Sequence, residues 1–212
     1  MTEPSYLNDV RSGYDAIAAE YAEMFRDQLA GDAYARAIHT AFAERVTGRV
    51  LEVGSGPGRT TAALRALGCD ISGVDLSPEM VALASRTFPD IRFEEGSMTA
   101  LDVPDGTLGG LVSWYSLIHI RPADHPAVIA EFHRVLRPGG RLLLGFQVGT
   151  EPLRLENPFG HPVTLDFHRL SPDRTADLLA DAGFDIEARL VRAPEGREAV
   201  PQAYLVAVRP DA

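Results

Sequence analysis

Residues 51–61 read Leu-Glu-Val-Gly-Ser-Gly-Pro-Gly-Arg-Thr-Thr, and this stretch decides the fold of the chain. An apolar run at 49–53 leads into three glycines at alternate positions, and a helix-forming segment at 60–67 follows directly. Because glycine has no Cβ, it lets the backbone fold sharply or come close to a ligand. We therefore predict a strand, a tight turn and a helix N-terminus.

The spacing of these glycines, Gly54, Gly56 and Gly58, narrows the class of ligand. The pattern is G-x-G-x-G, and Arg59 occupies the position of the last glycine in the dinucleotide fingerprint G-x-G-x-x-G. The turn therefore predicts a ligand of the adenosine type and argues against a ligand that carries a pyrophosphate.

Composition and charge limit the class of protein. A chain of 212 residues is long enough for one well-buried domain, which we expect to span 1–212. The net charge of −10 comes without a basic cluster, which argues against a nucleic-acid partner. All 20 basic residues are arginine, which excludes a lysine Schiff base and a phosphate-binding lysine. Cys69 is the only cysteine, which excludes an intrachain disulfide and a cysteine metal cluster.

The sequence also bears on location. Segment 1–11 is polar and lacks the apolar core of a signal peptide. No apolar stretch approaches the length of a membrane span. We expect a cytoplasmic protein without a membrane partner, present as a monomer or a homodimer.

Apolar periodicity predicts where helices and strands alternate. From Tyr14 to Val46 apolar residues recur at helical spacing with a break at Gly31, which predicts two helices. Ser77 and Ser171 each precede a proline and an acidic residue, the signature of a helix start. The predicted strands are 49–53, 70–75, 91–95, 109–114, 140–147, 184–191 and 202–209, and the later helices are 60–67, 78–87, 124–136 and 172–182.

This alternation predicts an α/β fold, a doubly wound seven-stranded sheet with helices on both faces. Only the short connection 193–201 separates the last two strands, so we expect a C-terminal antiparallel hairpin in a mostly parallel sheet. Segment 150–170 contains three prolines and is expected to be an irregular insert. Because it follows a strand, it should lie on the substrate side, over the crevice at the carboxyl ends of the strands.

Asp75 ends the second predicted strand, 21 positions after Gly54. A carboxylate at this place suits hydrogen bonds from both ribose hydroxyls of an adenosine-type ligand. The alternative is a residue that caps a helix or stabilises a loop. The glycine turn before it favours the ribose role.

Four motifs follow one another along the chain: Glu52-Val-Gly-Ser-Gly-Pro-Gly58, Gly73-Val-Asp-Leu-Ser-Pro-Glu-Met80, Gly96-Ser-Met98 and Val135-Leu-Arg-Pro-Gly-Gly140. In this order they resemble the motifs of class I S-adenosylmethionine-dependent methyltransferases, a Rossmann-like family. The resemblance covers roughly residues 10–209 and includes the terminal hairpin. The first two motifs together are fairly specific, whereas Arg-Pro-Gly-Gly is also a common turn between a helix and a strand.

The resemblance implies S-adenosylmethionine as the cofactor, with the glycine turn facing its methionine portion. The turn residues in this role would be Gly54, Ser55, Gly56 and Gly58. Glu52 would lie beneath the turn and hold either the turn or the cofactor amine.

The resemblance also implies contacts for the nucleoside. Asp75 would bind the ribose, and Leu76 and Met80 would lie beside the adenine, although either can equally be a core residue. Ser97 stands where family members often have an aspartate that binds the adenine amino group, and a serine accepts that hydrogen bond without a charge. The backbone of Met98 would meet the edge of the adenine ring.

The N-terminal segment 1–46 is similar to the helical lid of the family. Tyr14 and Tyr21 lie in it, within Tyr-Asp-Ala-Ile-Ala-Ala-Glu-Tyr, and a tyrosine of the lid often reaches the cofactor. The alternative is that each aromatic ring fills an interface between helices.

The stretch 112–120, Val-Ser-Trp-Tyr-Ser-Leu-Ile-His-Ile, should open onto the reaction site. His119 is our candidate for the catalytic general base, because histidine titrates near neutral pH and this one follows the end of a strand. The alternatives are a histidine that braces the loop or merely lines the pocket. Trp114 and Tyr115 can wall the pocket, and we expect Trp114 to contact the cofactor.

The insert contains His161, Asp166 and His168, which raises the question of a metal site. Their spacing is irregular and they lie in a proline-containing loop, so we favour solvated loop residues and predict no metal. Arg154 or Arg169 can pair with an anionic group of a substrate, or be ordinary surface arginines.

Together these residues predict in-line transfer of a methyl group from S-adenosylmethionine to an O, N or C nucleophile of a small molecule. Such a reaction needs alignment and exclusion of water more than a metal or a covalent nucleophile. Two other classes remain: a non-catalytic or repurposed S-adenosylmethionine-binding protein, and an NAD-dependent oxidoreductase. Arg59 and the terminal hairpin argue against the oxidoreductase.

Overall fold

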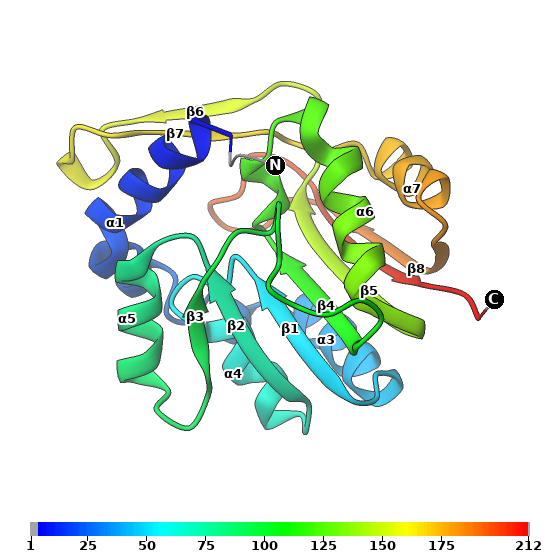
Figure 1. Cartoon of the computed structure of the whole chain (residues 1–212). Coiled ribbons are helices and arrows are strands. Elements are labelled where there is room, and N and C mark those ends of the chain that lie inside the picture. The colour runs from blue at the N-terminus through cyan, green and yellow to red at the C-terminus, as the bar shows by residue number, and fades with distance from the viewer. Residues whose placement is uncertain (1–3, 212) are drawn as a thin grey trace.

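The computed structural model describes residues 4–211, and a seven-stranded sheet organises them (Figure 1). The strand order is β3-β2-β1-β4-β5-β9-β8. Neighbours from β3 to β5 are parallel, whereas β9 pairs antiparallel with both β5 and β8. The strands are β1 Arg49–Val53, β2 Asp70–Asp75, β3 Phe93–Glu95, β4 Leu108–Trp114, β5 Leu136–Gln147, β8 Asp185–Arg192 and β9 Gln202–Val208. The predicted sheet and its antiparallel hairpin are confirmed.

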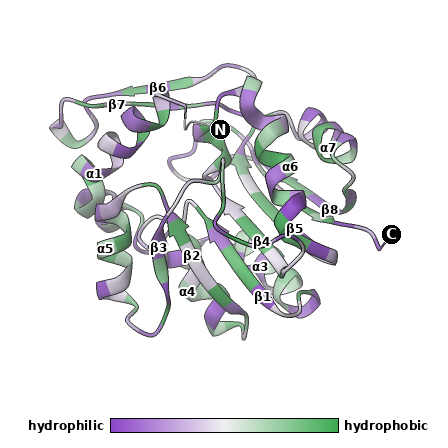
Figure 2. Cartoon of the chain, in the orientation of Figure 1, coloured by the Kyte–Doolittle hydropathy of each residue, from purple (hydrophilic) through white to green (hydrophobic). Residues whose placement is uncertain are grey.

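Helices cover both faces of the sheet and bury a separate core on each. They are α3 Ala33–Arg45, α4 Arg59–Ala66, α5 Pro78–Thr87, α6 His125–Val135 and α7 Pro172–Asp181. One core joins α6 and α7 to the sheet, and the other joins α3 and α4 to it. Alternate residues of β5 serve the two cores, since Leu142 and Leu144 belong to the first and Leu143 to the second. Hydrophobic residues accordingly follow the central strands (Figure 2).

Two helices begin where Ser77 and Ser171 predicted them to begin. The Ser77 hydroxyl accepts a hydrogen bond from the Met80 amide at 3.1 Å, and the Ser171 hydroxyl accepts one from the Arg174 amide at 3.5 Å. Strand β5 begins at Leu136, earlier than the expected residue 140, because Leu136 already pairs with Leu108. A register shift in β4 between Leu108 and Gly110 accommodates the added residues.

The N-terminal region differs from the two helices expected at 14–46. Helix α1 runs from Tyr6 to Met24, a short helix α2 covers Gln28–Gly31, and α3 follows. Asp32 separates the last two, because its side chain accepts a hydrogen bond from the Ala35 amide at 2.8 Å and caps α3.

The insert at 150–170 is not irregular, which corrects the expectation from its prolines. It forms an antiparallel hairpin of β6 Leu153–Glu156 and β7 Thr164–Phe167. The three prolines precede β6, lie in the short 3₁₀ turn Pro158–Gly160, or precede β7, so none interrupts the ladder. The hairpin lies beside α1, beyond the carboxyl ends of β1, β2 and β4 (Figure 1).

Within residues 4–211, none of the helices has the length and apolar character needed to cross a membrane.

One buried polar residue stands out in the core beneath α3. His39 is 1% exposed, its ring lies 4.2 Å from that of Trp114, and neither ring nitrogen has a hydrogen-bond partner among the described residues. Burial lowers the pKa of His39 to about 4, although Asp32 nearby favours the charged form. The fold therefore holds His39 neutral.

The substitution His39→Phe tests this pH dependence. The stability that neutral His39 contributes is complete above its unfolded pKa of 6.5 and is lost as the pH falls toward the folded value of about 4. Between pH 7 and pH 5 the free energy of unfolding of His39→Phe should therefore rise by about 2 kcal/mol relative to wild type. Urea denaturation of both proteins measures it, and a constant difference across this range would contradict it.

Candidate functional site

The glycine turn lies where β1 ends and is held by a serine from another strand end. Gly54 adopts a φ of +66°, and a Cβ there would lie 2.3 Å from the Ser116 Cβ. The Ser116 hydroxyl donates to the Val53 carbonyl at 2.6 Å and shares a hydrogen bond with the Ser113 hydroxyl at 2.7 Å. The turn is thus packed against the loop after β4, and only glycine fits at position 54.

Asp75 fastens the other side of the turn. Its carboxylate accepts hydrogen bonds from the Gly56 amide at 2.7 Å and from the Ser77 amide at 2.9 Å. Burial raises the pKa of Asp75, and these two amides oppose that shift. Each carboxylate oxygen keeps a further lone pair, so Asp75 can still accept hydroxyl groups of a ligand. The ribose role stays a prediction, and Asp75 also stabilises the loop as the alternative held.

The side chains of Glu52 and Ser55 are buried beneath the backbone of the turn. Glu52 is 1% exposed and accepts a hydrogen bond from the Thr61 hydroxyl on α4. Burial raises the pKa of Glu52 to about 8, which leaves the carboxyl group mostly protonated at pH 7. The Ser55 hydroxyl is buried and has no partner within residues 4–211. Glu52 is therefore tied to α4, and its two predicted roles, toward the turn or toward the cofactor amine, stay predictions.

The four other residues that we predicted to contact the nucleoside differ in how exposed they are. Met98 approaches the turn, with its methyl carbon 3.6 Å from the point where a Gly54 Cβ would lie. The Ser97 hydroxyl bonds to the Thr99 hydroxyl at 2.8 Å within its own turn. Leu76 is half-buried, whereas Met80 is 1% exposed and so is a core residue in this structure. Their contacts with adenine stay predictions.

Tyr14, His119 and Asp166 form a hydrogen-bonded chain across three segments. The Asp166 backbone carbonyl lies 3.1 Å from His119 Nδ1, and a carbonyl only accepts, so Nδ1 carries the proton. His119 Nε2 is then the acceptor for the Tyr14 hydroxyl at 2.7 Å. Within the loop, the His119 amide donates to the Ser116 carbonyl at 3.1 Å. Ser116 therefore contacts the glycine turn on one side and His119 on the other.

Burial keeps the Tyr14 and His119 side chains uncharged. It lowers the pKa of His119 to about 4, and the Asp166 carbonyl opposes the shift. It raises the pKa of Tyr14 well above the usual value, and the nearby Tyr21 and Asp75 raise it further. At pH 7 the pair is a neutral phenol that donates to a neutral imidazole.

Trp114 and Tyr115 turn toward α3. The Trp114 ring stacks on Tyr204 at 4.8 Å and packs against His39, and both Trp114 and Tyr115 border the core beneath α3. The structure does not bring Trp114 together with the other predicted site residues, and its contact with the cofactor stays a prediction. Tyr115 has a φ of +54°, a strained conformation for a residue with a side chain.

Several charged residues of the insert are paired with α1 or with one another. His161 lies 3.1 Å from Glu20 of α1, and Arg154 binds both oxygens of Asp166 at 3.2 Å. A cavity of about 470 Å³ lies between α1 and the hairpin, with Arg121 and Asp166 among its lining residues. No group of three metal-ligating side chains occurs within residues 4–211.

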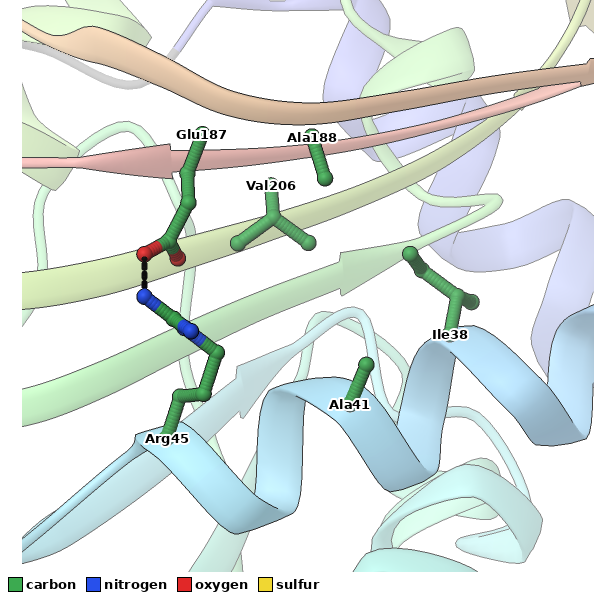
Figure 3. Close-up of a pocket in the computed structure, with 6 residues that line it drawn as sticks. All are labelled: Ile38, Ala41, Arg45, Glu187, Ala188 and Val206. Atoms are coloured by element: carbon green, nitrogen blue, oxygen red, sulfur yellow. Dashed lines mark hydrogen bonds and ion pairs between the residues drawn. The ribbon is translucent and has the colours of Figure 1, made fainter.

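A second cavity, of about 260 Å³, lies on the α3 side of the last strands (Figure 3). Ile38 and Ala41 of α3 face Ala188 and Val206 across it. None of its lining residues comes from the glycine turn or from the loop after β4. It is separate from the candidate site.

The sequence analysis missed two parts of this site. The role of Ser116 could have been predicted, because Ser113 and Ser116 are two serines at a mostly apolar strand end. The Asp166 contact gave none, because it uses a backbone carbonyl brought in by the hairpin.

Comparison with known proteins agrees with this geometry. A family model described as a methyltransferase domain matches residues 50–140. Burkholderia thailandensis 1,6-didemethyltoxoflavin-N1-methyltransferase, solved with 1,6-didemethyltoxoflavin and S-adenosylhomocysteine bound, is 25% identical with a TM-score of 0.75. That match covers 100% of this chain and 92% of the other. Residues 50–140 therefore match a methyltransferase domain, and the whole chain has the fold of class I S-adenosylmethionine-dependent methyltransferases.

Two curated relatives extend the comparison. Demethylmenaquinone methyltransferase of Beutenbergia cavernae is 34% identical over 140 residues, which are 65% of this chain and 57% of that protein. The same enzyme of Chlorobaculum parvum is 28% identical over 156 residues, which are 73% of this chain and 60% of that protein. The chain therefore spans less than two thirds of the length of either relative.

The candidate site fits an adenosine-type ligand. Asp75 stands beside the turn, and each oxygen of its carboxylate keeps a lone pair beyond its hydrogen bond to a backbone amide. A Cβ built on Gly56 would meet nothing within 4 Å, so the turn has open space on that side. These features suit close approach of a ligand to the backbone.

Gly56→Ala tests whether this open space holds the ligand. Gly56 has a φ of +52°, so alanine adds backbone strain of about 1–2 kcal/mol and a methyl group above the turn. We expect a folded protein whose Kd for S-adenosylhomocysteine, measured by calorimetry, rises at least about tenfold. Gly48→Ala is the matched control, because Gly48 has a φ of +81°, equally open surroundings and a place before β1. Equal affinities of the two variants would contradict the assignment.

Proposed function

We propose that this protein transfers the methyl group of S-adenosylmethionine to an O, N or C nucleophile of a small molecule. One observation carries the proposal. Ser116 connects the glycine turn to the loop that holds His119, so a donor site and a hydrogen-bonding pair adjoin at one edge of the sheet. The names of the relatives support a small acceptor, since they act on demethylmenaquinone and 1,6-didemethyltoxoflavin.

The residues of the chain would hold the donor, align the acceptor and exclude water. S-adenosylmethionine supplies a methyl group already activated on a sulfonium. Asp75, the turn and Met98 would position the nucleoside and methionine portions. Helix α1 and the β6–β7 hairpin lie over the carboxyl ends of the strands and meet at His119, so they would enclose the acceptor.

The Tyr14–His119 pair would accept the proton of the acceptor. A neutral O–H or N–H group becomes strongly acidic once its heavy atom is methylated, so a weak base is sufficient. The Tyr14 oxygen can accept that proton while its own proton moves to His119 Nε2. The Asp166 carbonyl would stabilise the imidazolium through Nδ1.

Two binding measurements and one turnover assay test the function. Calorimetry should show binding of S-adenosylhomocysteine and none of NAD. Incubation with S-adenosylmethionine and a panel of phenols, heteroaromatic amines and quinols should produce S-adenosylhomocysteine with at least one acceptor. Binding without turnover on any acceptor would favour a repurposed S-adenosylmethionine-binding protein, and binding of NAD alone would favour an oxidoreductase.

His119→Ala should lower turnover at least about tenfold while the Kd for S-adenosylhomocysteine changes less than about twofold. Turnover should fall because the variant lacks the proton acceptor. The Kd should stay nearly constant because His119 does not line the glycine turn. Tyr14→Phe should lower turnover in the same way, because it removes the hydroxyl and keeps the ring. Both rates are measured by formation of S-adenosylhomocysteine.

His119→Gln separates proton transfer from bracing, since an amide can hydrogen-bond but does not titrate. A histidine with a pKa of about 4 also predicts turnover that falls with acid around pH 4 and is level above about pH 5. Full turnover in His119→Gln would assign His119 to bracing the loop.

A further inference from the structure

Arg169 follows strand β7 and is one of the two insert arginines that the sequence offered for an anionic group of a substrate. The other, Arg154, is exposed and pairs with the carboxylates of Asp166 and Glu156. Arg169 differs, because it is half-buried and no carboxylate within residues 4–211 pairs with it. Its Nε is buried without a hydrogen-bond partner in the same part of the chain. The insert therefore contains a partly buried cation without a counterion.

Backbone pairing determines the side on which Arg169 lies. The Leu170 amide donates to the Gln147 carbonyl at 2.9 Å, the Gly149 amide donates to the Leu170 carbonyl at 3.1 Å, and Leu170 thereby pairs in parallel with Val148. Leu170 belongs to the core beneath α6 and α7, and Val148 packs against that core. Since side chains alternate along paired extended chains, Gln147 and Arg169 project to the opposite side. A Cβ built on Gly149 would lie 2.9 Å from the Arg169 Cδ, so the arginine side chain lies across this glycine.

Gln147 provides a second unpartnered polar group on this side, at the carboxyl end of β5. Its side-chain Oε1 is buried and has no hydrogen-bond partner within residues 4–211. A hydrogen bond between Gln147 and Arg169 would still leave the positive charge without an anion. Buried polar groups are normally hydrogen-bonded, and a cation withdrawn from water is unfavourable without an anion. The two groups therefore match a ligand that carries a negative charge and a hydrogen-bond donor.

The segment that carries Arg169 also contacts the loop that carries His119. The His168 amide donates to the Ile118 carbonyl at 2.7 Å, and the Phe167 ring lies 4.8 Å from the His119 ring. Arg169 stands two residues beyond Phe167, which is roughly 7 Å along an extended chain. A small molecule anchored at Arg169 can therefore extend to His119.

We infer that Arg169 binds a carboxylate of the methyl acceptor, so that the acceptor is a small carboxylic acid. The inference rests on the proposed function, because that function encloses the acceptor beneath α1 and the β6–β7 hairpin. A guanidinium can bind a carboxylate through two parallel hydrogen bonds, one from Nε and one from a terminal nitrogen. The Nε of Arg169 is the atom without a partner, and Gln147 Oε1 would accept a hydrogen bond from a hydroxyl or amino group of the same acid.

Matched pairs of acids and amides test the inference. The pairs are 4-hydroxybenzoic acid with 4-hydroxybenzamide, 3,4-dihydroxybenzoic acid with its amide, and 2-aminobenzoic acid with its amide. For each, kcat/KM is measured from the formation of S-adenosylhomocysteine. Wild-type protein should prefer at least one acid over its amide by at least about tenfold. In Arg169→Gln this preference should fall to within about threefold, because the variant lacks the group that distinguishes the two.

Arg154→Gln is the matched control from the same insert. Arg154 is exposed and already paired with Asp166 at 3.2 Å, so this variant should keep the wild-type preference for the acid. Arg169→Lys keeps the charge without the planar fork and should retain part of the preference. It also provides a folded variant if Arg169→Gln is unstable. The Kd for S-adenosylhomocysteine should change less than about twofold in all three variants, because neither arginine lies at the glycine turn.

Three outcomes would overturn the inference. Turnover of amides or other neutral acceptors by wild-type protein without a preference for any acid would exclude a carboxylate subsite and leave the proposed function standing. An unchanged acid preference in Arg169→Gln would assign Arg169 to packing across Gly149. Absence of turnover on every acid, amide and neutral acceptor would refute the proposed function itself, and the inference with it.

Discussion

The hydrogen bond from the Gly56 amide to the Asp75 carboxylate, 2.7 Å long, is the interaction on which the site depends. It joins the turn after β1 to the end of β2, and the Ser77 amide bound to the same carboxylate sets the start of α5. Because Asp75 is buried, breaking this contact would leave one of its carboxylate oxygens without this hydrogen bond in the protein interior. The sheet therefore holds the turn in shape without any ligand contact.

Much of this arrangement could be predicted from the sequence, because its causes are local. Alternate glycines, a strand before them and a helix after them specify one kind of turn, and Ser77 and Ser171 mark helix starts through contacts within three residues. The spacing from Gly54 to Asp75 placed the two at one edge because adjacent parallel strands end together.

The features that could not be predicted from the sequence arise from contacts between distant segments. The β6–β7 hairpin was not expected, because prolines indicate irregular structure unless strand ends are known. Tyr14 and His119 are 105 positions apart, and nothing local indicates that they share a hydrogen bond. The packing of Trp114 on Tyr204 and His39 could not be predicted either, since a strand end near the crevice does not reveal which face of the sheet a side chain takes.

The hairpin and α1 have a consequence for how such a chain changes over generations. The segment shared with the methyltransferase domain model, 50–140, contains the turn, Asp75 and His119, whereas α1 and the hairpin lie outside it. The outer segments meet His119 through a phenol hydroxyl and a backbone carbonyl, and the carbonyl is available from any side chain at position 166. Substitutions at position 166 of the hairpin can therefore keep the hydrogen bond to His119, while the strands within 50–140 keep the turn and Asp75 in place.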